Sequence, residues 1–384
     1  MRTFLTATAL IVAAVIAGCS PAATVNQPGQ SAADQPTVST GSGRSSVVTA
    51  SCTGSVSDAA SLQKAIDSST AGSIIEIKGP VCLLVRGITF LSDRTYVGYN
   101  TTGTILKQDG AMKYVLASAA YADNSPSTGD PVTIRDLTVQ CSGSGNTDGI
   151  IVLNWQADVE EVDVNDCGGS GIVDTNTTAN GGAINNTSVN SRFDNNFISD
   201  SREYGFEVQD SENSVTDGFL EDNQIAYSGL DAIHLENAAG WDISGNNLYS
   251  DSQNAIYASR LYGTTISNNY IEDFGDTQGS GTWYGIVATV QGAVGSSISN
   301  NNISNDKGES PRARYIYLGI TGTNYGTGYL SVTGNVIVGV RTSDVGLSFS
   351  GGSNKLVVAS SGNEVANVGT VTTETPSVSE TAGT

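Results

Sequence analysis

The feature of this sequence that most restricts its fold is a six-residue pattern that returns along the second half of the chain. The pattern reads apolar–x–x–Asn–x–apolar, and its asparagines are Asn196, Asn223, Asn246, Asn269, Asn301 and Asn335. Val162–Asn165 matches the start of the pattern and predicts an earlier member. The spacing of the asparagines, about 23 to 34 residues, is typical of solenoids, in which each repeat forms one coil that stacks on the next.

A second motif follows each of these segments. It reads small–apolar–x–apolar and occurs at Gly205–Val208, Ala232–Leu235, Ala255–Ala258, Gly285–Ala288 and Gly346–Phe349, with Tyr315–Leu318 as a large-residue variant. Each coil therefore carries at least two short strands joined at a fixed turn. Asn180–Gly181 is the only Asn-Gly pair, whereas antiparallel hairpins would repeat this signal. We predict an all-β fold of parallel coils, with the asparagines stacked about 4.8 Å apart.

A short amphipathic segment precedes the coils. Its apolar residues, at helical spacing, are Ala59, Leu62, Ala65 and Ile66. Asp58 suits the N-cap position of this helix. We expect the helix to cover the open N-terminal end of the core, as a solenoid requires, and the first coil to start at Ile74–Ile77.

The N-terminus has the features of an export signal. Arg2 precedes an apolar run, from Phe4 to Ile16, that is too short to span a bilayer. The run ends in Ile-Ala-Gly-Cys19, which resembles the lipobox of bacterial lipoproteins. This resemblance implies that Cys19 is acylated and anchors the protein at the bacterial cell surface. An ordinary signal peptide with a chance cysteine is the alternative.

Composition sets the predicted domain boundaries. We expect a lipoprotein signal peptide over residues 1–18, a lipid-anchored flexible linker over 19–48, a coiled domain over 49–365 and a disordered tail over 366–384. The linker and the tail are rich in small and polar residues, so neither is expected to bury a core.

Four cysteines follow Cys19 in the chain: Cys52, Cys82, Cys141 and Cys167. An even number of cysteines in an exported protein favours disulfides over metal ligation. Pairing neighbours along the chain predicts the disulfides Cys52–Cys82 and Cys141–Cys167. Reduced thiols in the core are the alternative.

The opening of the coiled region resembles a known superfamily. A cap helix, then GSIIEIKGPVCLL at 72–84 and GITFLSDRTYVGYNTTGTIL at 87–106, is similar to the start of the pectate-lyase-like superfamily. The resemblance covers residues 48–366 and implies a single-stranded, right-handed parallel β-helix. It also implies work on carbohydrates, since the superfamily contains lyases, inverting hydrolases, epimerases, transferases and depolymerases.

Alternation along the second strand of each coil separates inward from outward side chains. We expect one outward row to contain Glu207, His234, Tyr257, Val287, Tyr317 and Ser348. The next outward row is expected to contain Gln209, Glu236, Ser259, Thr289, Gly319 and Ser350. The preceding turn is expected to contain Tyr204, Asp231, Asn254, Tyr284 and Arg314. This face gathers the only histidine of the chain with three carboxylates, and we predict that it is the functional face.

Two kinds of acid–base chemistry fit this face. On an ideal sheet Glu207 and Glu236 are diagonal neighbours about 8 Å apart, which suits inverting glycoside hydrolysis. His234, beside Glu207, suits instead the removal of a proton, as in a lyase or epimerase. The predicted catalytic residues are Glu207, Asp231, His234 and Glu236. The predicted substrate-binding residues, beside two lengthened turns, are Tyr204, Tyr257, Trp283, Tyr284, Arg314 and Tyr317.

The local signatures of individual enzymes in the superfamily are incomplete. Asn146–Ile150 matches only the first piece of the polygalacturonase-type set, so Asp148 lacks a second acid and we interpret the segment as another turn and strand. The arginine-centred strand motif of pectate lyases and the Asp-Pro-His-Glu motif of alginate epimerases are absent. Residues 230–248 resemble inulin fructotransferases loosely, which implies an acidic role for Asp231.

The charge balance narrows the expected partners. With 38 acidic residues, 17 basic residues and a net charge of −21, the chain repels nucleic acid. We expect a cell-surface polysaccharide-active enzyme, a glycoside hydrolase or transferase that binds a neutral or weakly charged glycan without a cofactor. A non-catalytic glycan-binding or adhesive lipoprotein and a calcium-dependent polyuronate lyase are the alternatives, so calcium is the one metal left open.

Overall fold

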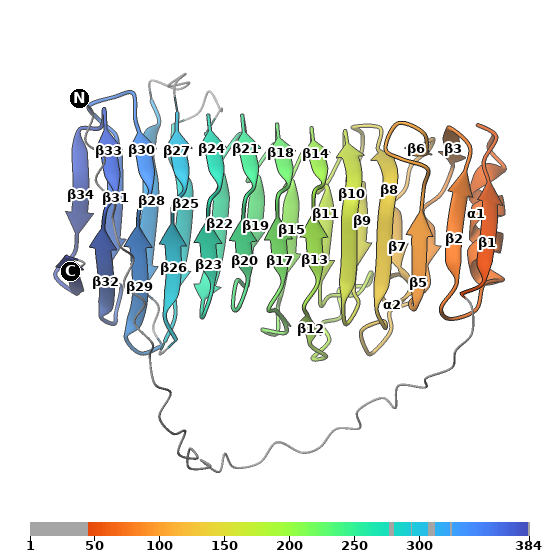
Figure 1. Cartoon of the computed structure of the whole chain (residues 1–384), viewed down its shortest axis with the longest axis horizontal. Coiled ribbons are helices and arrows are strands. Elements are labelled where there is room, and N and C mark those ends of the chain that lie inside the picture. Colours follow the sequence, from red (N-terminus) through yellow and green to blue (C-terminus); the bar gives the residue numbers. More distant parts are fainter. Residues whose placement is uncertain (1–44, 276–279, 293, 306–311, 323–324, 383–384) are drawn as a thin grey trace, which may run out of the picture. The chain divides into compact units, whose positions relative to one another are not determined.

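The computed structural model describes residues 45–275, 280–292, 294–305, 312–322 and 325–382. The predicted signal peptide, Cys19 and most of the predicted linker lie outside these residues. The named strands pair in parallel, and the coils stack in the order of the sequence (Figure 1). Each coil contributes strands to three columns. In the described part of the chain, no helix is long and apolar enough to cross a membrane.

The first column is a separate sheet and carries the candidate site. Its strands are β4 (Ile88–Phe90), β7 (Tyr114–Ser118), β9 (Asp148–Val152), β11 (Ile172–Thr175), β15 (Phe206–Gln209), β19 (Ile233–Leu235), β22 (Ile256–Leu261), β25 (Thr282–Val290), β28 (Arg314–Gly322), β31 (Val345–Ser350) and β34 (Thr370–Glu374). The helix α2 (Ala119–Ala122) follows β7 directly.

The second and third columns are joined through two long strands, β8 (Val132–Gln140) and β10 (Ala157–Asn165). The rest of the second column is β1 (Val47–Ser51), β2 (Ile74–Lys78), β5 (Arg94–Val97), β13 (Arg192–Asp194), β17 (Phe219–Glu221), β20 (Asp242–Ser244), β23 (Thr265–Ser267), β26 (Ser296–Ser299), β29 (Gly328–Thr333), β32 (Leu356–Ser361) and β35 (Val378–Ala382). The rest of the third is β3 (Val81–Leu84), β6 (Ile105–Gln108), β14 (Phe197–Ser199), β18 (Gln224–Ala226), β21 (Asn247–Tyr249), β24 (Tyr270–Glu272), β27 (Asn302–Ser304), β30 (Val336–Val338) and β33 (Glu364–Ala366). A small extra pair is β12 (Ser188–Val189) with β16 (Val215–Thr216).

The interior of the coils is an apolar core built by stacking like residues. Phe206, Ile233, Ile256 and Ile286 are paired partners on successive strands of the first column, and all four are fully buried. Such rows remove apolar surface from water along the whole stack of coils. The fold is the predicted one, a right-handed parallel β-helix.

The predicted asparagine ladder is present inside the turns between the second and third columns. Both the backbone N–H and the Nδ2 of Asn223 donate to Oδ1 of Asn246, at 3.0 Å each. The same pair of bonds repeats along the ladder from Asn196 to Asn335, and Asn363 extends it by one rung. The left-handed residue of each turn precedes the ladder asparagine, and Asp222 and Gly245 occupy that position.

Val162–Asn165 joins the ladder differently from the prediction. Asn165 pairs with Ser199, three residues beyond the ladder position. The backbone N–H of Val162 instead donates to Oδ1 of Asn196 at 3.1 Å. The prediction that Asn165 is a ladder member is therefore wrong, because β10 runs through this corner as one long strand.

The N-terminal end of the core is covered as expected by α1 (Asp58–Asp67), which buries Ala59, Leu62 and Ile66. Ser57, not Asp58, occupies the N-cap position. The carboxylate of Asp58 instead accepts backbone N–H groups of the preceding loop and of β3, between 2.9 and 3.2 Å. Burial alone would raise the pKa of Asp58, but these donors outweigh it and hold the pKa below its usual value.

The predicted disulfides are both present. Cys52 is bonded to Cys82, and Cys141 is bonded to Cys167. All four cysteines are buried. Because both disulfides are formed, the alternative of reduced core thiols does not hold.

Residues 370–374 and 378–382 form strands, contrary to the disordered tail predicted over residues 366–384, whose last two residues lie outside the described part of the chain. Strands β34 and β35 pair in parallel with β31 and β32. The residues of β34 are exposed or half-buried, so the backbone ladder rather than core burial holds this segment. The first strand, β1, likewise begins ahead of the expected first coil and pairs with β2.

Candidate functional site

The outward row of the first column is covered in the early coils, becomes polar at the buried Glu207 and is partly exposed at His234. In the coils before it, the row contains Ala117, Ile151 and Val173, which form a buried apolar cluster. Tyr114 and Tyr121, on β7 and α2, pack against this cluster. From Glu207 onward the row continues through His234 and Tyr257, as predicted. The candidate site therefore starts where the covering residues end.

His234 is held between two aromatic rings and a carboxylate. Its ring stacks on Tyr204 at 4.2 Å and on Tyr257 at 4.5 Å between centroids. Its Nδ1 lies 2.8 Å from Oδ2 of Asp231. A carboxylate can only accept a hydrogen bond, so the contact favours the tautomer in which Nδ1 carries the proton and donates it to Asp231. Nε2 then has a free lone pair.

Asp231 is buried and its oxygens are occupied by donors. Besides His234, the backbone N–H and Nδ2 of Asn254 donate to its Oδ1, at 2.9 and 2.8 Å. Asn254 is positioned in turn by the N–H of Tyr284, which donates to its Oδ1 at 3.0 Å. These bonds fix the carboxylate that orients His234.

Glu207 lies beside His234, and its carboxylate is also held by neighbours. Ser170 donates from Oγ to Oε2 at 2.7 Å, and Gln209 donates from Nε2 to Oε1 at 2.9 Å. Burial raises the pKa of Glu207, against these two hydrogen bonds, which lower it. Glu207 is thus a buried carboxyl group whose protonated form is favoured relative to one in water.

Asp148 is a member of the site that the sequence analysis set aside. The backbone N–H of Ser170 donates to Oδ1 of Asp148 at 2.8 Å, so Ser170 contacts both Asp148 and Glu207. Burial first, and then the charges of Glu207 and Glu203, raise the pKa of Asp148 to about 7. Extending the register of β9, β11 and β15 by two residues places Asp148 level with Ser170 and Tyr204, a relationship that no local sequence motif shows.

Glu236 points to a different neighbour. Its Oε2 accepts the backbone N–H of Asp210 at 2.9 Å, and its side chain is exposed. It lines a hollow further along the strands rather than contacting Glu207 or His234. In the described residues, the expected Glu207–Glu236 pair shares no hydrogen-bond partner.

The predicted alignment is wrong in the last coils. Tyr284 pairs with Ile316, and Arg314 lies opposite Thr282, outside the predicted turn row. Gly319, not Tyr317, continues the outward row from Val287. Partners on the two strands are 32 residues apart throughout, from Thr282 opposite Arg314 to Val290 opposite Gly322. The predicted row of Tyr284 and Arg314 assumed a separation of 30 residues.

Tyr317 is fully buried in the core, where its ring contacts Phe274 at 5.5 Å between centroids. It cannot contact a substrate on the outer face, so its predicted binding role is wrong. Tyr315 and Leu318, from the same strand, are buried in the same core.

The two remaining aromatic residues differ in their surroundings. Trp283 packs against the core, and its Nε1 is buried. The ring of Tyr284 lies over Gly319, where an added Cβ would approach its Cδ1 to 2.6 Å. Tyr284 therefore remains on the outer face, whereas Trp283 packs against the core.

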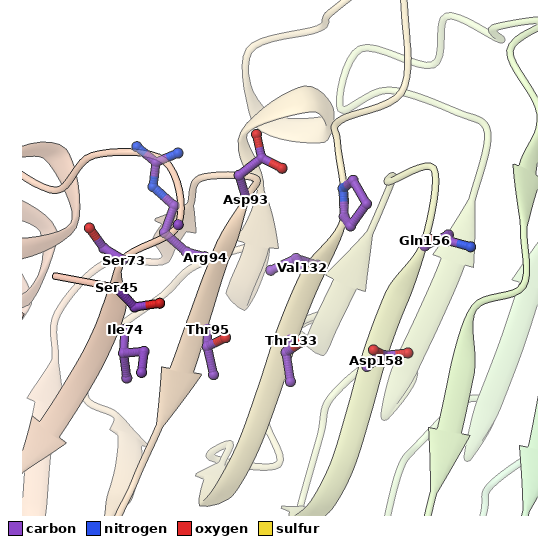
Figure 2. A pocket seen from close by; sticks show the side chains of 12 residues that line it. Ser45, Ser73, Ile74, Asp93, Arg94, Thr95, Val132, Thr133, Gln156 and Asp158 are labelled. Carbon is purple, nitrogen blue, oxygen red and sulfur yellow. The ribbon is translucent and has the colours of Figure 1, made fainter. Parts of the chain in front are cut away.

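Another hollow, of about 300 Å³, lies at the ends of β2, β5, β8 and β10 and not in the row of His234 (Figure 2). Arg94 is the only arginine that lines this hollow, and its guanidinium donates hydrogen bonds to Ser69 and Ser92. Arg94 therefore has a structural role there. In the described part of the chain, no group of three or more histidine, cysteine, aspartate or glutamate residues is placed to hold a metal ion.

No model of a protein family matches the chain, and no curated protein sequence matches it. Solved structures do. The A-module of a mannuronan C-5 epimerase from Azotobacter vinelandii superposes with a TM-score of 0.58 at 17% identity, over 85% of this chain and 96% of that one. The family 28 exopolygalacturonase of Yersinia enterocolitica gives a TM-score of 0.51 at 11% identity, over 87% and 78%.

The Dettilon tailspike protein, gp208, gives a TM-score of 0.51 at 12% identity, over 84% of this chain and 68% of the tailspike. The likeness is one of fold. It places the chain among the parallel β-helix structures and agrees with the column arrangement described above.

Proposed function

We propose that the protein is a polysaccharide-active enzyme, and that His234 acts as a base that removes a proton from a sugar carbon. The observation that carries the proposal is the hydrogen bond between Nδ1 of His234 and Asp231, at 2.8 Å. This bond orients the imidazole, leaves Nε2 as the basic nitrogen and stabilises the positive charge that forms when Nε2 takes a proton.

Tyr204 is the proposed partner of this base. Burial, and next the charge of Asp231, raise the pKa of its hydroxyl to about 12, so the hydroxyl stays protonated at neutral pH. A neutral hydroxyl beside the base can donate a proton or a hydrogen bond to the reacting sugar. When the carbon–hydrogen bond breaks, its electron pair moves into an adjacent carboxyl group of the sugar. The pair then either expels the linkage oxygen, as in a lyase, or takes a proton on the other face, as in an epimerase.

The comparisons support action on a polysaccharide, and the choice of reaction rests on the geometry of His234 and Asp231. The epimerase is named for chemistry at C-5 of a sugar in mannuronan, and the exopolygalacturonase is named for a polysaccharide. Both resemble this chain in fold, and in this chain the polar row lies on the outer face of the first column.

Glycoside hydrolysis, the activity expected from the sequence, is the second candidate. Its supporting observation is the pair Asp148 and Glu207, which share Ser170 and both have raised pKa values. A carboxyl group with a pKa of about 7 can serve as the general acid of an inverting or retaining hydrolase. In this second candidate, Asp148 takes the place of Glu236 as the partner of Glu207.

The proposed location remains the bacterial cell surface, with a lipid on Cys19 and an export signal before it. Two disulfides in the described domain support an oxidising compartment. Bacterial cells that produce the protein can be grown with radioactive palmitate to test this proposal. The protein should carry the label, and Cys19→Ser should abolish it.

A glycan panel in deuterated water tests the reaction. Deuterium at a sugar carbon, or an unsaturated product that absorbs in the ultraviolet, supports the proposal if His234→Gln abolishes it. Shortened, saturated and undeuterated products support hydrolysis instead. Binding to a glycan with no change in any of them would leave the non-catalytic, adhesive alternative. Tyr329→Phe, an exposed tyrosine on β29 in the second column, is the matched control.

A further inference from the structure

Strand β22 contains a β-bulge that turns an arginine toward the outer face. Ala258 pairs with Ala288 and Leu261 pairs with Val290, so two residues of β22 stand opposite one residue of β25. Arg260 is one of these two residues, and its φ of 56° lies in the left-handed region. An arginine seldom adopts this conformation, and bulges frequently re-aim a side chain near a functional site.

The guanidinium of Arg260 is held by amide oxygens rather than by an acid. Its Nε donates to Oε1 of Gln291 and its Nη1 donates to Oδ1 of Asn237, both at 3.0 Å. Asn237 is 1% exposed, and its Nδ2 donates to Asp210, which fixes its Oδ1 toward the arginine. Gln291 and Asn237 together form a clamp on Arg260, and Asn237 is buried and oriented.

Arg260 has no ion pair within the described residues, although the chain has 38 acidic and only 17 basic residues. Two of the five N–H groups of a guanidinium are used by the clamp, and three remain. A half-buried, oriented guanidinium of this kind matches the geometry of a carboxylate.

The arginine lines a hollow of about 700 Å³ on the same face as His234. Gln291, which holds Arg260, and Glu236 also line the hollow. Tyr257, the neighbour of His234, lies three residues before Arg260 on β22. Three residues of strand span about 10 Å, so the hollow lies beside the proposed reacting site rather than in it.

We propose that this hollow is a subsite for an acidic sugar unit and that Arg260 binds the carboxylate of that unit. The inference rests on the proposed function, since it places the subsite along the same polysaccharide chain. It also supplies the local positive charge that an anionic glycan needs on a protein with a net charge of −21. Glu236 is the opposing charge in the hollow, so its removal should strengthen the binding of an acidic unit.

The test is a titration of the full chain with oligomannuronate and oligogalacturonate, each compared with its carboxyl-reduced, neutral form. Arg260→Gln should weaken binding of an acidic form by roughly 10- to 100-fold and leave the neutral form unchanged. Arg260→Lys should weaken binding of the acidic form less than Arg260→Gln, because lysine keeps the positive charge but lacks the paired N–H groups of the guanidinium. Arg135→Gln, on β8 of another column, is the control.

The two proposals fail in different ways. Equal weakening of the acidic and the neutral form by Arg260→Gln, or no weakening of either, overturns the subsite, with the melting temperature of the variant confirming that it is folded. Turnover that depends on His234 would then still support the proposed function. A charge-selective loss in a protein that turns over no glycan would support the subsite and overturn the proposed function.

Discussion

The Nδ1 atom of His234 lies 2.8 Å from Oδ2 of Asp231, while Oδ1 of the same carboxylate accepts two hydrogen bonds from Asn254. His234 and Asp231 come from one coil and Asn254 from the next, so the stacking of coils positions the base. The same stacking places Tyr204 and Tyr257 on the two faces of the imidazole. A solenoid fold thus converts a repeat of similar strands into one asymmetric site.

Asp231→Asn should lower kcat by roughly 10³- to 10⁴-fold with little change in KM. The amide keeps the shape and the acceptor for Asn254 if its oxygen takes the Oδ1 position. It then presents N–H to His234 and reverses the favoured tautomer. Steady-state kinetics check this outcome, and circular dichroism checks the fold. A rise in KM at unchanged kcat would instead mean that Asp231 serves binding.

Tyr204→Phe should lower kcat by roughly 10²- to 10⁴-fold, because it removes the proposed proton donor while keeping the ring that stacks on His234. Tyr257→Phe is the matched control, since this ring stacks on the other face of the same imidazole. Its effect should be much smaller. Equal losses in the two variants would mean that both hydroxyl groups only help to hold His234.

The regular part of the chain made the early rows of the site predictable. From Asn196 to Tyr204, Asn223 to Asp231 and Asn246 to Asn254 the steps are identical in length, so the register could be read directly from the sequence. The structure confirms the row from Glu207 through His234 to Tyr257.

The predicted register is wrong where the repeat becomes irregular. Longer turns before β25 and β28, and the large residues of Tyr315–Leu318, hide the alignment that moves Gly319 into the outward row. Asp148 was set aside because its partner was sought in local sequence motifs. Its neighbours are Ser170 and Glu207, which only the stacking of coils brings to it.

Stability should fall with rising pH in a way that depends on Asp148. Its pKa is about 7 in the folded chain against 3.8 for an ordinary aspartate, so between about pH 4 and pH 7 the folded state keeps a proton that the unfolded state has lost. The stabilising effect of that proton is complete below about pH 4 and is lost as the pH rises through about 7. In Asp148→Asn this part of the slope should disappear.

Urea unfolding at about pH 4, 5.5 and 7.5 measures the slope for both proteins. Asn is a suitable replacement because its Oδ1 can still accept the N–H of Ser170. Asp67→Asn, an exposed residue at the end of α1, is the control and should keep the slope of the parent chain. Parallel slopes for Asp148→Asn and the parent chain would show that the proton is held elsewhere.

Removing a central rung of the asparagine ladder should destabilise the domain more than removing its last rung. Asn246 is fully buried, its Oδ1 accepts two N–H groups of Asn223 and its Nδ2 donates to the carbonyl of Leu220. Asn246→Ala leaves these groups buried without partners, which costs roughly 2 to 3 kcal/mol. Asn363→Ala removes a half-buried rung near the C-terminal end, where water can replace the lost bonds, so it should cost less. Thermal melting of both variants checks this order, and equal losses would mean that the ladder contributes through turn geometry rather than through burial.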